Sequence, residues 1–236
     1  MGAFVVVDGI DGSGKGVVID AFREWCEANK LRVINLRDFY SENGCFPSEE
    51  ALGECDAIFS SEPSYGCMGR AISEEMLKNA NDYSVVSVAW AFALDREVLY
   101  NKVIITALKQ GKYVFQERGV SSSLVYQPVQ GRISFKELIQ MPGNRLALKH
   151  APNLLIITRV EPQLVVERMK EKGELQEGVF RRLSFQRKVD QRYASGWLKQ
   201  LFERFKTKVV YLDTNPPKSI EQTKSEVLQL WQDFKK

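Results

Sequence analysis

The sequence predicts an α/β fold in which a five-stranded parallel sheet carries helices on both faces. Runs rich in β-branched and aromatic residues alternate along the chain with segments whose apolar residues recur at helical spacing. This alternation is typical of parallel strands that are joined by crossover helices. The first apolar run, residues 4–8, also ends in a glycine-rich segment that leads directly into a helical pattern.

That glycine-rich segment has the spacing G-x-x-x-x-G-K of a phosphate-binding loop, with Lys15 as its lysine. Its glycines let backbone N–H groups come close to phosphate oxygens, and Lys15 would reach the β- and γ-phosphates of a nucleotide. Gly16 follows, where the motif normally has a Ser or Thr whose hydroxyl holds Mg²⁺. The residues that we expect to bind the nucleotide phosphates are Gly9, Asp11, Gly12, Ser13, Gly14, Lys15 and Gly16.

The first half of the chain continues with elements of both kinds. An amphipathic helix should follow the loop, and residues 31–36 should form the second strand. Residues 38–64 lack a period and are rich in Gly, Pro, Ser, Asn, Asp and Glu, so we expect a long loop there. Residues 67–79 read as a helix, and capping residues at 81–84 precede a long helix over 85–111.

The second half repeats the alternation of strands and helices. Three more strands are expected, at residues 113–115, 154–158 and 208–212. Pro128 should stop the helix that begins at residue 121, and Pro142-Gly143 should interrupt the next one. The helices expected here are 121–127, 135–149, 161–169, one long helix over 185–205, and one from Ser219 onward.

Composition is that of an ordinary globular protein, with 236 residues, 44% hydrophobic and 27% charged, so we expect a single domain over 1–236. The net charge of +3 is too small to indicate binding to nucleic acid or to a membrane. No signal-like segment precedes Phe4, and no apolar run approaches the roughly 18 residues that a membrane span needs. These features favour a cytoplasmic protein.

The four cysteines form no C-x-x-C pair, and the chain has one histidine, His150. Free thiols in a reducing compartment are the favoured interpretation. A zinc site built from Cys45, Cys55 and Cys67 is the alternative.

Charged residues follow several of the expected strands. In an open parallel sheet, ligands bind beyond the carboxyl ends of the strands. This rule brings together the phosphate loop, Glu62-Pro63, Glu117-Arg118 and the turn after Leu212. Arg118 could clamp a phosphate group with both arms of its guanidinium. A purely structural pair with Glu117 is the alternative for this arginine.

Five segments, taken in order, resemble one family. They are residues 7–15 (Val-Asp-Gly-Ile-Asp-Gly-Ser-Gly-Lys), Glu62-Pro63, residues 91–96 (Ala-Phe-Ala-Leu-Asp-Arg), residues 117–127 and the basic segment 168–175. Together they resemble the thymidylate kinases, of the P-loop nucleoside monophosphate kinase family, over nearly the whole chain. The resemblance implies a P-loop NTPase fold and the ATP-dependent phosphorylation of dTMP to dTDP with Mg²⁺. It also implies a small basic lid at about 168–178.

The resemblance assigns roles to single residues. Asp11 would meet the sugar 3′-hydroxyl, Phe92 would stack on the thymine ring, and Arg96 would hydrogen-bond the base or the acceptor phosphate. A place in the core is the alternative for Phe92, whose helix needs an apolar face. Substrate-binding residues are then Asp11, Glu62, Arg70, Phe92, Arg96, Arg118, Ser122 and Gln127, and catalytic residues are Lys15, Glu117, Arg118, Arg168, Lys170 and Lys172.

The variable positions of the phosphate loop carry no basic residue. In the resembling family such a loop goes with catalytic basic residues in the lid, so the resemblance assigns the lid cations to catalysis. The alternative for the lid is a solvated charged turn. Homodimers are usual in the resembling family, and the helix over 85–108 is the candidate interface.

Four positions depart from the family pattern: Gly16, Ser61, Glu117, which stands where the pattern has an aspartate, and Gly119, which replaces an aromatic residue. Gly16 lacks the Mg²⁺-binding hydroxyl, so we expect the metal to be held by phosphates, water and a carboxylate such as Glu117 or Asp8. Ser61 stands where many relatives have an arginine, and Arg70 could replace that charge. These departures leave two alternatives: a kinase for another nucleotide or a deoxynucleoside, or a nucleotide-binding protein with impaired catalysis.

Overall fold

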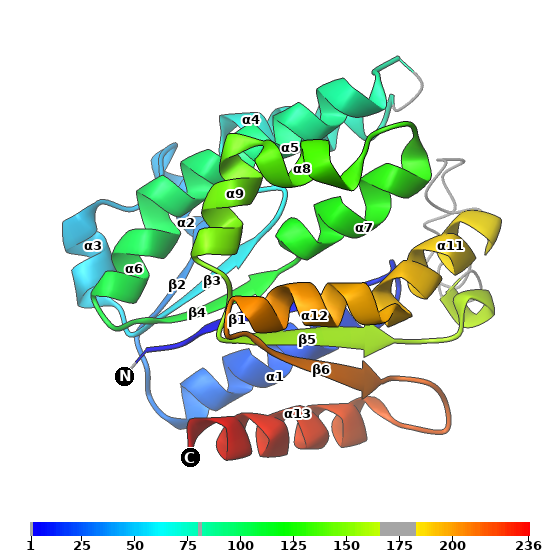
Figure 1. Cartoon of the computed structure of the whole chain (residues 1–236). Coiled ribbons are helices and arrows are strands. Elements are labelled where there is room, and N and C mark those ends of the chain that lie inside the picture. Colours follow the sequence, from blue (N-terminus) through cyan, green and yellow to red (C-terminus); the bar gives the residue numbers. More distant parts are fainter. Residues whose placement is uncertain (1, 80–81, 166–182) are drawn as a thin grey trace.

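A computed structural model describes residues 2–79, 82–165 and 183–236 (Figure 1). Its parallel sheet has the order β2-β3-β4-β1-β5-β6. The strands are β1 (Phe4–Gly9), β2 (Val33–Asn35), β3 (Ala57–Ser61), β4 (Tyr113–Glu117), β5 (Leu154–Arg159) and β6 (Lys208–Asp213). The predicted α/β class with a parallel sheet is therefore confirmed.

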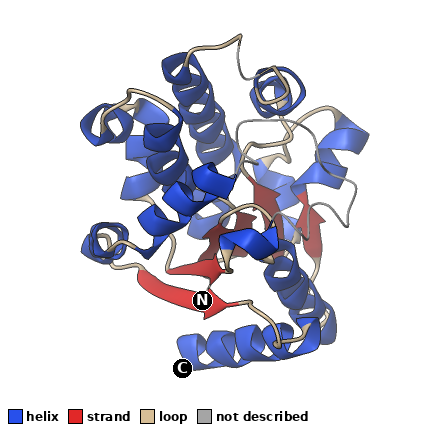
Figure 2. Ribbon diagram, turned by 90° about the vertical axis from the view of Figure 1, so that its right-hand side faces the viewer, coloured by secondary structure: helices blue, strands red, loops and turns tan. Residues whose placement is uncertain are grey.

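Helices connect the strands and cover both faces of the sheet (Figures 1 and 2). They are α1 (Lys15–Ala28), α2 (Leu36–Asn43), α3 (Glu49–Glu54), α4 (Cys67–Ala71), α5 (Val85–Leu99), α6 (Ile105–Lys109), α7 (Val120–Gln130), α8 (Phe135–Gln140), α9 (Pro142–Lys149), α11 (Leu183–Ala194), α12 (Gly196–Arg204) and α13 (Ile220–Lys235). Two π-helical turns, η1 (Ile72–Met76) and η2 (Tyr100–Ile104), continue α4 and join α5 to α6. Within the described ranges, no helix has both the length and the apolar character to cross a membrane.

The two faces of the sheet have separate cores. On one face α1 and α13 pack on the strands, and rings from both helices, such as Phe22 and Trp231, meet Phe115 of β4. The opposite face is covered by the helices that build the rest of the molecule, including α5, α7 and α9. There α9 crosses α5 so closely that a Cβ atom on Gly143 would lie 1.7 Å from the carbonyl oxygen of Ala93. This close crossing fixes α5, which carries several of the predicted site residues.

The expectation of five strands was one too low for the sheet in the described part of the chain. The additional strand, β3, lies inside residues 38–64, where a long loop was predicted. It contains only a short apolar stretch with polar residues on both sides, so the polar composition of this interval predicted a loop instead of a strand. The same interval also holds α2 and α3, whose N-termini are capped by the side chains of Asn35 and Ser48.

Two helix boundaries also differ from the prediction. Pro128 lies inside α7 and does not stop it. A proline there leaves the carbonyl four residues earlier, that of Leu124, without its helical donor, and Arg192 of α11 donates to this oxygen at 3.0 Å. The helix expected over 185–205 is divided into α11 and α12 at Ser195, whose extended backbone begins the second helix.

Candidate active site

The strand register brings the predicted loops to one edge of the sheet. Ser61 at the end of β3 pairs with Glu117 of β4, and Glu117 also pairs with Val7 of β1. On the other side of β1, Gly9 pairs with Thr158 of β5. The phosphate loop, the Glu62-Pro63 turn and Arg118 are therefore neighbours at the carboxyl edge, as predicted.

The phosphate loop is held from two sides. Gly9 has φ of 142°, and a Cβ atom there would lie 2.5 Å from the carbonyl oxygen of Thr158, so the turn requires glycine. The Ser13 hydroxyl lies 2.5 Å from that of Thr158, and the Thr214 hydroxyl donates to the Ser13 carbonyl at 2.9 Å. The loops after β5 and β6 thus fix the backbone that would surround a phosphate.

Lys15 is buried at the start of α1 and donates to the carbonyls of Gly9 and Ile10 at 3.3 and 2.8 Å. Burial, together with the charge of Arg118, lowers the pKa of its ammonium group to about 8, although Asp11 and other carboxylates oppose the shift. The Lys15 ammonium group therefore titrates only slightly above neutral pH. An anion bound beside it would favour the charged form.

Arg118 pairs with Asp11 and not with Glu117. One arm of its guanidinium bonds to the Asp11 carboxylate, and the other lies 3.4 Å from the Ser122 hydroxyl. Burial alone would raise the pKa of Asp11, but the charges of Arg118 and Lys15 outweigh it and lower that pKa. Asp11 is thus an ionised carboxylate between two cations, one from each side of the predicted site.

Asp8 and Glu117, the two predicted metal ligands, have very different surroundings. Asp8 is fully buried, and its carboxylate accepts bonds from the Gly9 N–H and from the hydroxyls of Ser121, Ser122 and Tyr193. Glu117 is half-buried, and no hydrogen bond from the described residues reaches its carboxylate. Its charge lies close enough to Lys15 to oppose the lowering of that lysine's pKa. Of the two, Glu117 has the carboxylate that could take a further ligand.

Glu62 and Arg96 form an ion pair that is almost completely buried, with side chains 3% and 1% exposed. Arg96 also bonds to the side chains of Asn144 and Ser123. Burial raises the pKa of Glu62, although the charge of Arg96 opposes the shift. The pair therefore lies within the wall beside the site, and the direct contact with substrate predicted for Arg96 stays a prediction.

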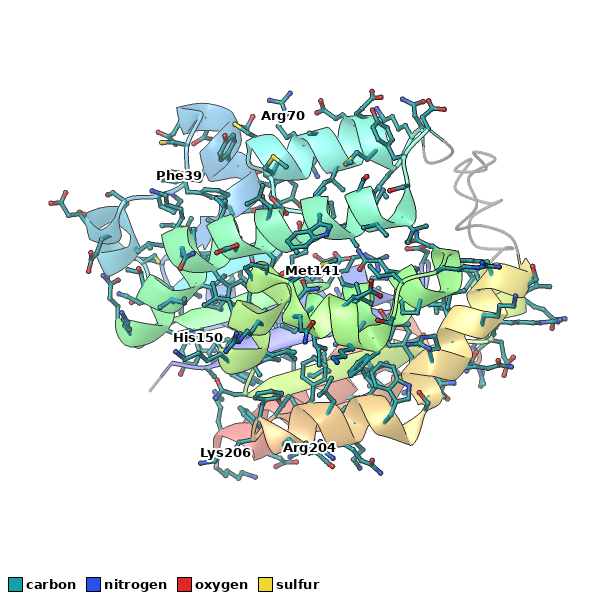
Figure 3. All side chains as sticks on the ribbon, turned by 45° about the horizontal axis from the view of Figure 1, so that its top comes forward. Phe39, Arg70, Met141, His150, Arg204 and Lys206 are labelled. Carbon is teal, nitrogen blue, oxygen red and sulfur yellow. The ribbon has the colours of Figure 1, made fainter. Side chains whose placement is uncertain are left out.

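The remaining predicted residues fall into three groups. Phe92 is half-buried on α5, and Gln127 on α7 is 2% exposed, with a side-chain oxygen that has no hydrogen-bond partner among the described residues. Arg70 pairs with Glu74 and points away from the body of the molecule (Figure 3), so the structure does not bring it to the site. The predicted lid residues Arg168, Lys170 and Lys172 lie outside the described residues.

Sequence reasoning missed several polar groups of the site. Tyr193 lies in the helix predicted over 185–205 and was not among the predicted site residues, yet its hydroxyl donates to Asp8 at 2.7 Å. Gln116, in the middle of a buried strand, donates to Glu62 at 3.1 Å and to the Arg118 carbonyl at 2.9 Å. A glutamine in an otherwise apolar strand was the signal available, because a buried amide needs partners.

No group of three or more His, Cys, Asp or Glu side chains among the described residues is arranged to hold a metal ion. The zinc alternative therefore finds no support, and the four cysteines are free thiols.

Comparisons with known proteins agree on one family. The family model for thymidylate kinase matches residues 49–227. The chain belongs to the thymidylate kinase family. A probable thymidylate kinase from Pyrococcus abyssi is 31% identical over 97% of this chain and 95% of its own length. The thymidylate kinase from Halalkalibacterium halodurans is 26% identical over the same shares.

A solved structure supports the same fold. The crystal structure of thymidylate kinase from Ehrlichia chaffeensis superposes with a TM-score of 0.63, at 19% identity, and covers 98% of this chain and 100% of its own. The predicted recognition of a P-loop kinase fold is confirmed, and so is the prediction that the chain is a phosphotransferase.

The lowered pKa of Lys15 predicts how nucleotide binding depends on pH. In the free protein, Lys15 should lose its proton as pH rises through about 8. In the complex, the bound phosphate should keep Lys15 protonated, so the affinity for the nucleotide should fall above that pH. Calorimetric titration with a non-hydrolysable ATP analogue should show a rising Kd between about pH 7.5 and 9.5, where phosphate, with a second pKa near 6, stays ionised.

Lys15→Met should bind more weakly and show a flat profile over the same range. An equal fall in affinity for the variant would contradict the assignment of this pH dependence to Lys15.

Proposed function

We propose that this protein transfers the γ-phosphoryl group of ATP to dTMP and so forms dTDP. Membership in the thymidylate kinase family supports this reaction. The observation that carries the proposal is the placement of Asp11 between Lys15 of the phosphate loop and Arg118 at the end of β4, whose charges both lower its pKa. Phosphoryl transfer needs cations on the donor side and on the acceptor side of one small site.

The residues divide between the two substrates. Lys15 and the backbone of the phosphate loop hold the donor phosphates, and Arg118 holds the phosphate of the acceptor. Asp11 accepts a hydrogen bond from the sugar 3′-hydroxyl. Phe92 stacks on the thymine ring, and the unpartnered oxygen of Gln127 supports its place beside the base or sugar.

The predicted lid completes this proposal. Arg168, Lys170 and Lys172 would close over the transferring phosphoryl group, add positive charge and exclude water.

A substrate panel tests the reaction. With ATP and Mg²⁺, ADP formation should be fastest with dTMP among dTMP, dUMP, dCMP, dGMP, AMP and thymidine. Lys15→Ala should lower kcat by about 100-fold or more, because this charge acts mainly on the transition state. Lys199→Ala, on an exposed lysine of α12 that pairs with Glu203, is the matched control and should be unchanged. Near-normal turnover by Lys15→Ala, or none by the wild type with any acceptor, would contradict the proposal.

Magnesium fits the site as an ion held mostly by phosphates and water. Gly16 offers no hydroxyl, but a carboxylate from Glu117 is half-exposed and stands near Lys15. Mg²⁺ usually keeps several waters and takes one or two protein carboxylates. When bound, it would neutralise charge on the β- and γ-phosphates. Asp8, already bonded to four donors, would orient Ser121, Ser122 and Tyr193 beside it.

The role of Glu117 can be measured through the metal dependence of activity. Glu117→Gln keeps the size of the side chain and removes its charge, so the Mg²⁺ concentration for half-maximal activity should rise by about tenfold or more. Glu161→Gln, on an exposed residue after β5, should leave this concentration unchanged. An unaltered metal dependence in Glu117→Gln would exclude its carboxylate from the metal shell.

We further propose that two copies associate through one face of α5. Val86, Trp90, Leu94 and Val98 recur every four residues and are 43%, 52%, 47% and 37% exposed. They therefore form a continuous apolar stripe along the helix, and a second copy of this stripe is its self-complementary partner. This helix is the one that the sequence indicated as a dimer interface.

Trp90→Glu places a charge in the centre of the stripe and should convert the dimer to a monomer, with the mass determined by light scattering after gel filtration. Ile220→Glu is the matched control, because Ile220 is 59% exposed at the start of α13, away from the stripe. A wild-type monomer, or a dimer that survives Trp90→Glu, would argue against this interface.

A cytoplasmic location remains part of the proposal. Free thiols at Cys26, Cys45, Cys55 and Cys67 agree with a reducing compartment.

A further inference from the structure

The acceptor side of the proposed site has little unshared positive charge among the described residues. A nucleoside monophosphate brings a phosphate with a charge of about −1.5 to −2 at neutral pH. Arg118 shares its charge with Asp11, and Arg96 shares its own with Glu62 inside the wall. A second cation at the same edge of the sheet would balance the acceptor phosphate.

Arg37 stands at that edge because of the register of β2. Strand β2 ends at Asn35, which pairs with Phe59 of β3. The chain turns into α2 at Leu36, so Arg37 lies in the first helical turn beyond the carboxyl end of β2, while β3 ends at Ser61. Ser61 pairs in turn with Glu117, the residue before Arg118.

The side chain of Arg37 is directed to the turn that follows Glu62-Pro63. Its guanidinium lies 5.7 Å from the ring centre of Tyr65, within the range of a cation–π contact. The neighbouring Ser64 is fixed to α5, because its N–H and hydroxyl both donate to Asp95, at 2.7 and 2.5 Å. A firmly held turn therefore carries the ring against which Arg37 rests.

The stability of α2 does not account for this arginine. Arg37 lies in the first turn of the helix, where its backbone N–H donates to the capping side chain of Asn35 at 3.2 Å. A cation at this end of a helix is disfavoured by the helix dipole. The side chain is exposed, and no carboxylate among the described residues pairs with it. Its charge is therefore free to meet an anion.

We infer that Arg37 binds the phosphate of the acceptor nucleoside monophosphate, opposite Arg118. This inference rests on the proposed function and assigns that site a second acceptor cation. Arg37 lies in α2, between the strand that the sequence predicted at residues 31–36 and the loop that it predicted at 38–64. Arg70, the cation that the sequence suggested for this purpose, pairs with Glu74 and points outward.

Binding measurements with dTMP and thymidine distinguish a contact with the phosphate from contacts with the base or the sugar, because the two ligands differ only in the phosphate. Titrated by calorimetry, Arg37→Ala should weaken dTMP binding by about tenfold or more, since a charge-assisted bond to phosphate is lost. Thymidine binding should be unchanged, because thymidine has no phosphate. Arg37→Lys should recover part of the loss, and added salt should shrink the difference between wild type and Arg37→Ala. Arg70→Ala is the matched control and should bind both ligands as the wild type does.

Two results would overturn the inference, and they are distinguishable. If Arg37→Ala binds dTMP as tightly as the wild type does, Arg37 is not a phosphate ligand, while the proposed kinase activity stands. An equal weakening for dTMP and thymidine would likewise exclude a phosphate contact. If the wild type binds no dTMP at all, the inference and the proposed function fail together.

Discussion

The buried pair of Glu62 and Arg96 is the interaction on which the wall beside the proposed acceptor site depends. Two ionised groups are expensive to bury unless their remaining donors and acceptors are also satisfied. Here the hydrogen-bond partners come from four parts of the fold. Arg96 of α5 donates to Glu62, which follows β3, and also to Ser123 of α7 and Asn144 of α9. The wall therefore assembles as a unit, and removing one partner of such a pair typically costs about 3–5 kcal/mol.

The same carboxylate determines the geometry of Arg118. Gln116 donates one hydrogen bond to Glu62 and another to the Arg118 carbonyl, while the Arg118 N–H donates to Val7 at 2.8 Å. These bonds hold the backbone of Arg118 at φ of 63°, which residues with side chains rarely adopt. The two arginine pairs thus differ in their exposure to solvent. Arg96, at 1% exposure, is enclosed within the wall, whereas Arg118, at 22%, is partly exposed to solvent.

Sequence patterns predicted those parts of the molecule in which one signal dominates. The phosphate loop has glycines at fixed positions, and the long helices have an apolar period, so both were recognised. Strand β3 was missed because a short strand between polar segments has neither signal, although it is central to placing Ser61 and Glu62. Ion pairs between residues far apart in the sequence could not be predicted either. Arg118 pairs with Asp11, 107 residues earlier in the chain, and not with the adjacent Glu117, and no local sequence pattern indicates such a distant partner.

The shortness of β2 has a consequence for the behaviour of the sheet in solution. As the outermost strand beside β3, it presents only residues 33–35 before α2 begins at Leu36. An edge strand is a template on which another chain can add its own backbone, and long, flat edges invite aggregation. Three residues followed at once by a helix offer almost no such template. The segment that brings Arg37 to the sheet thus also closes this side against unwanted pairing.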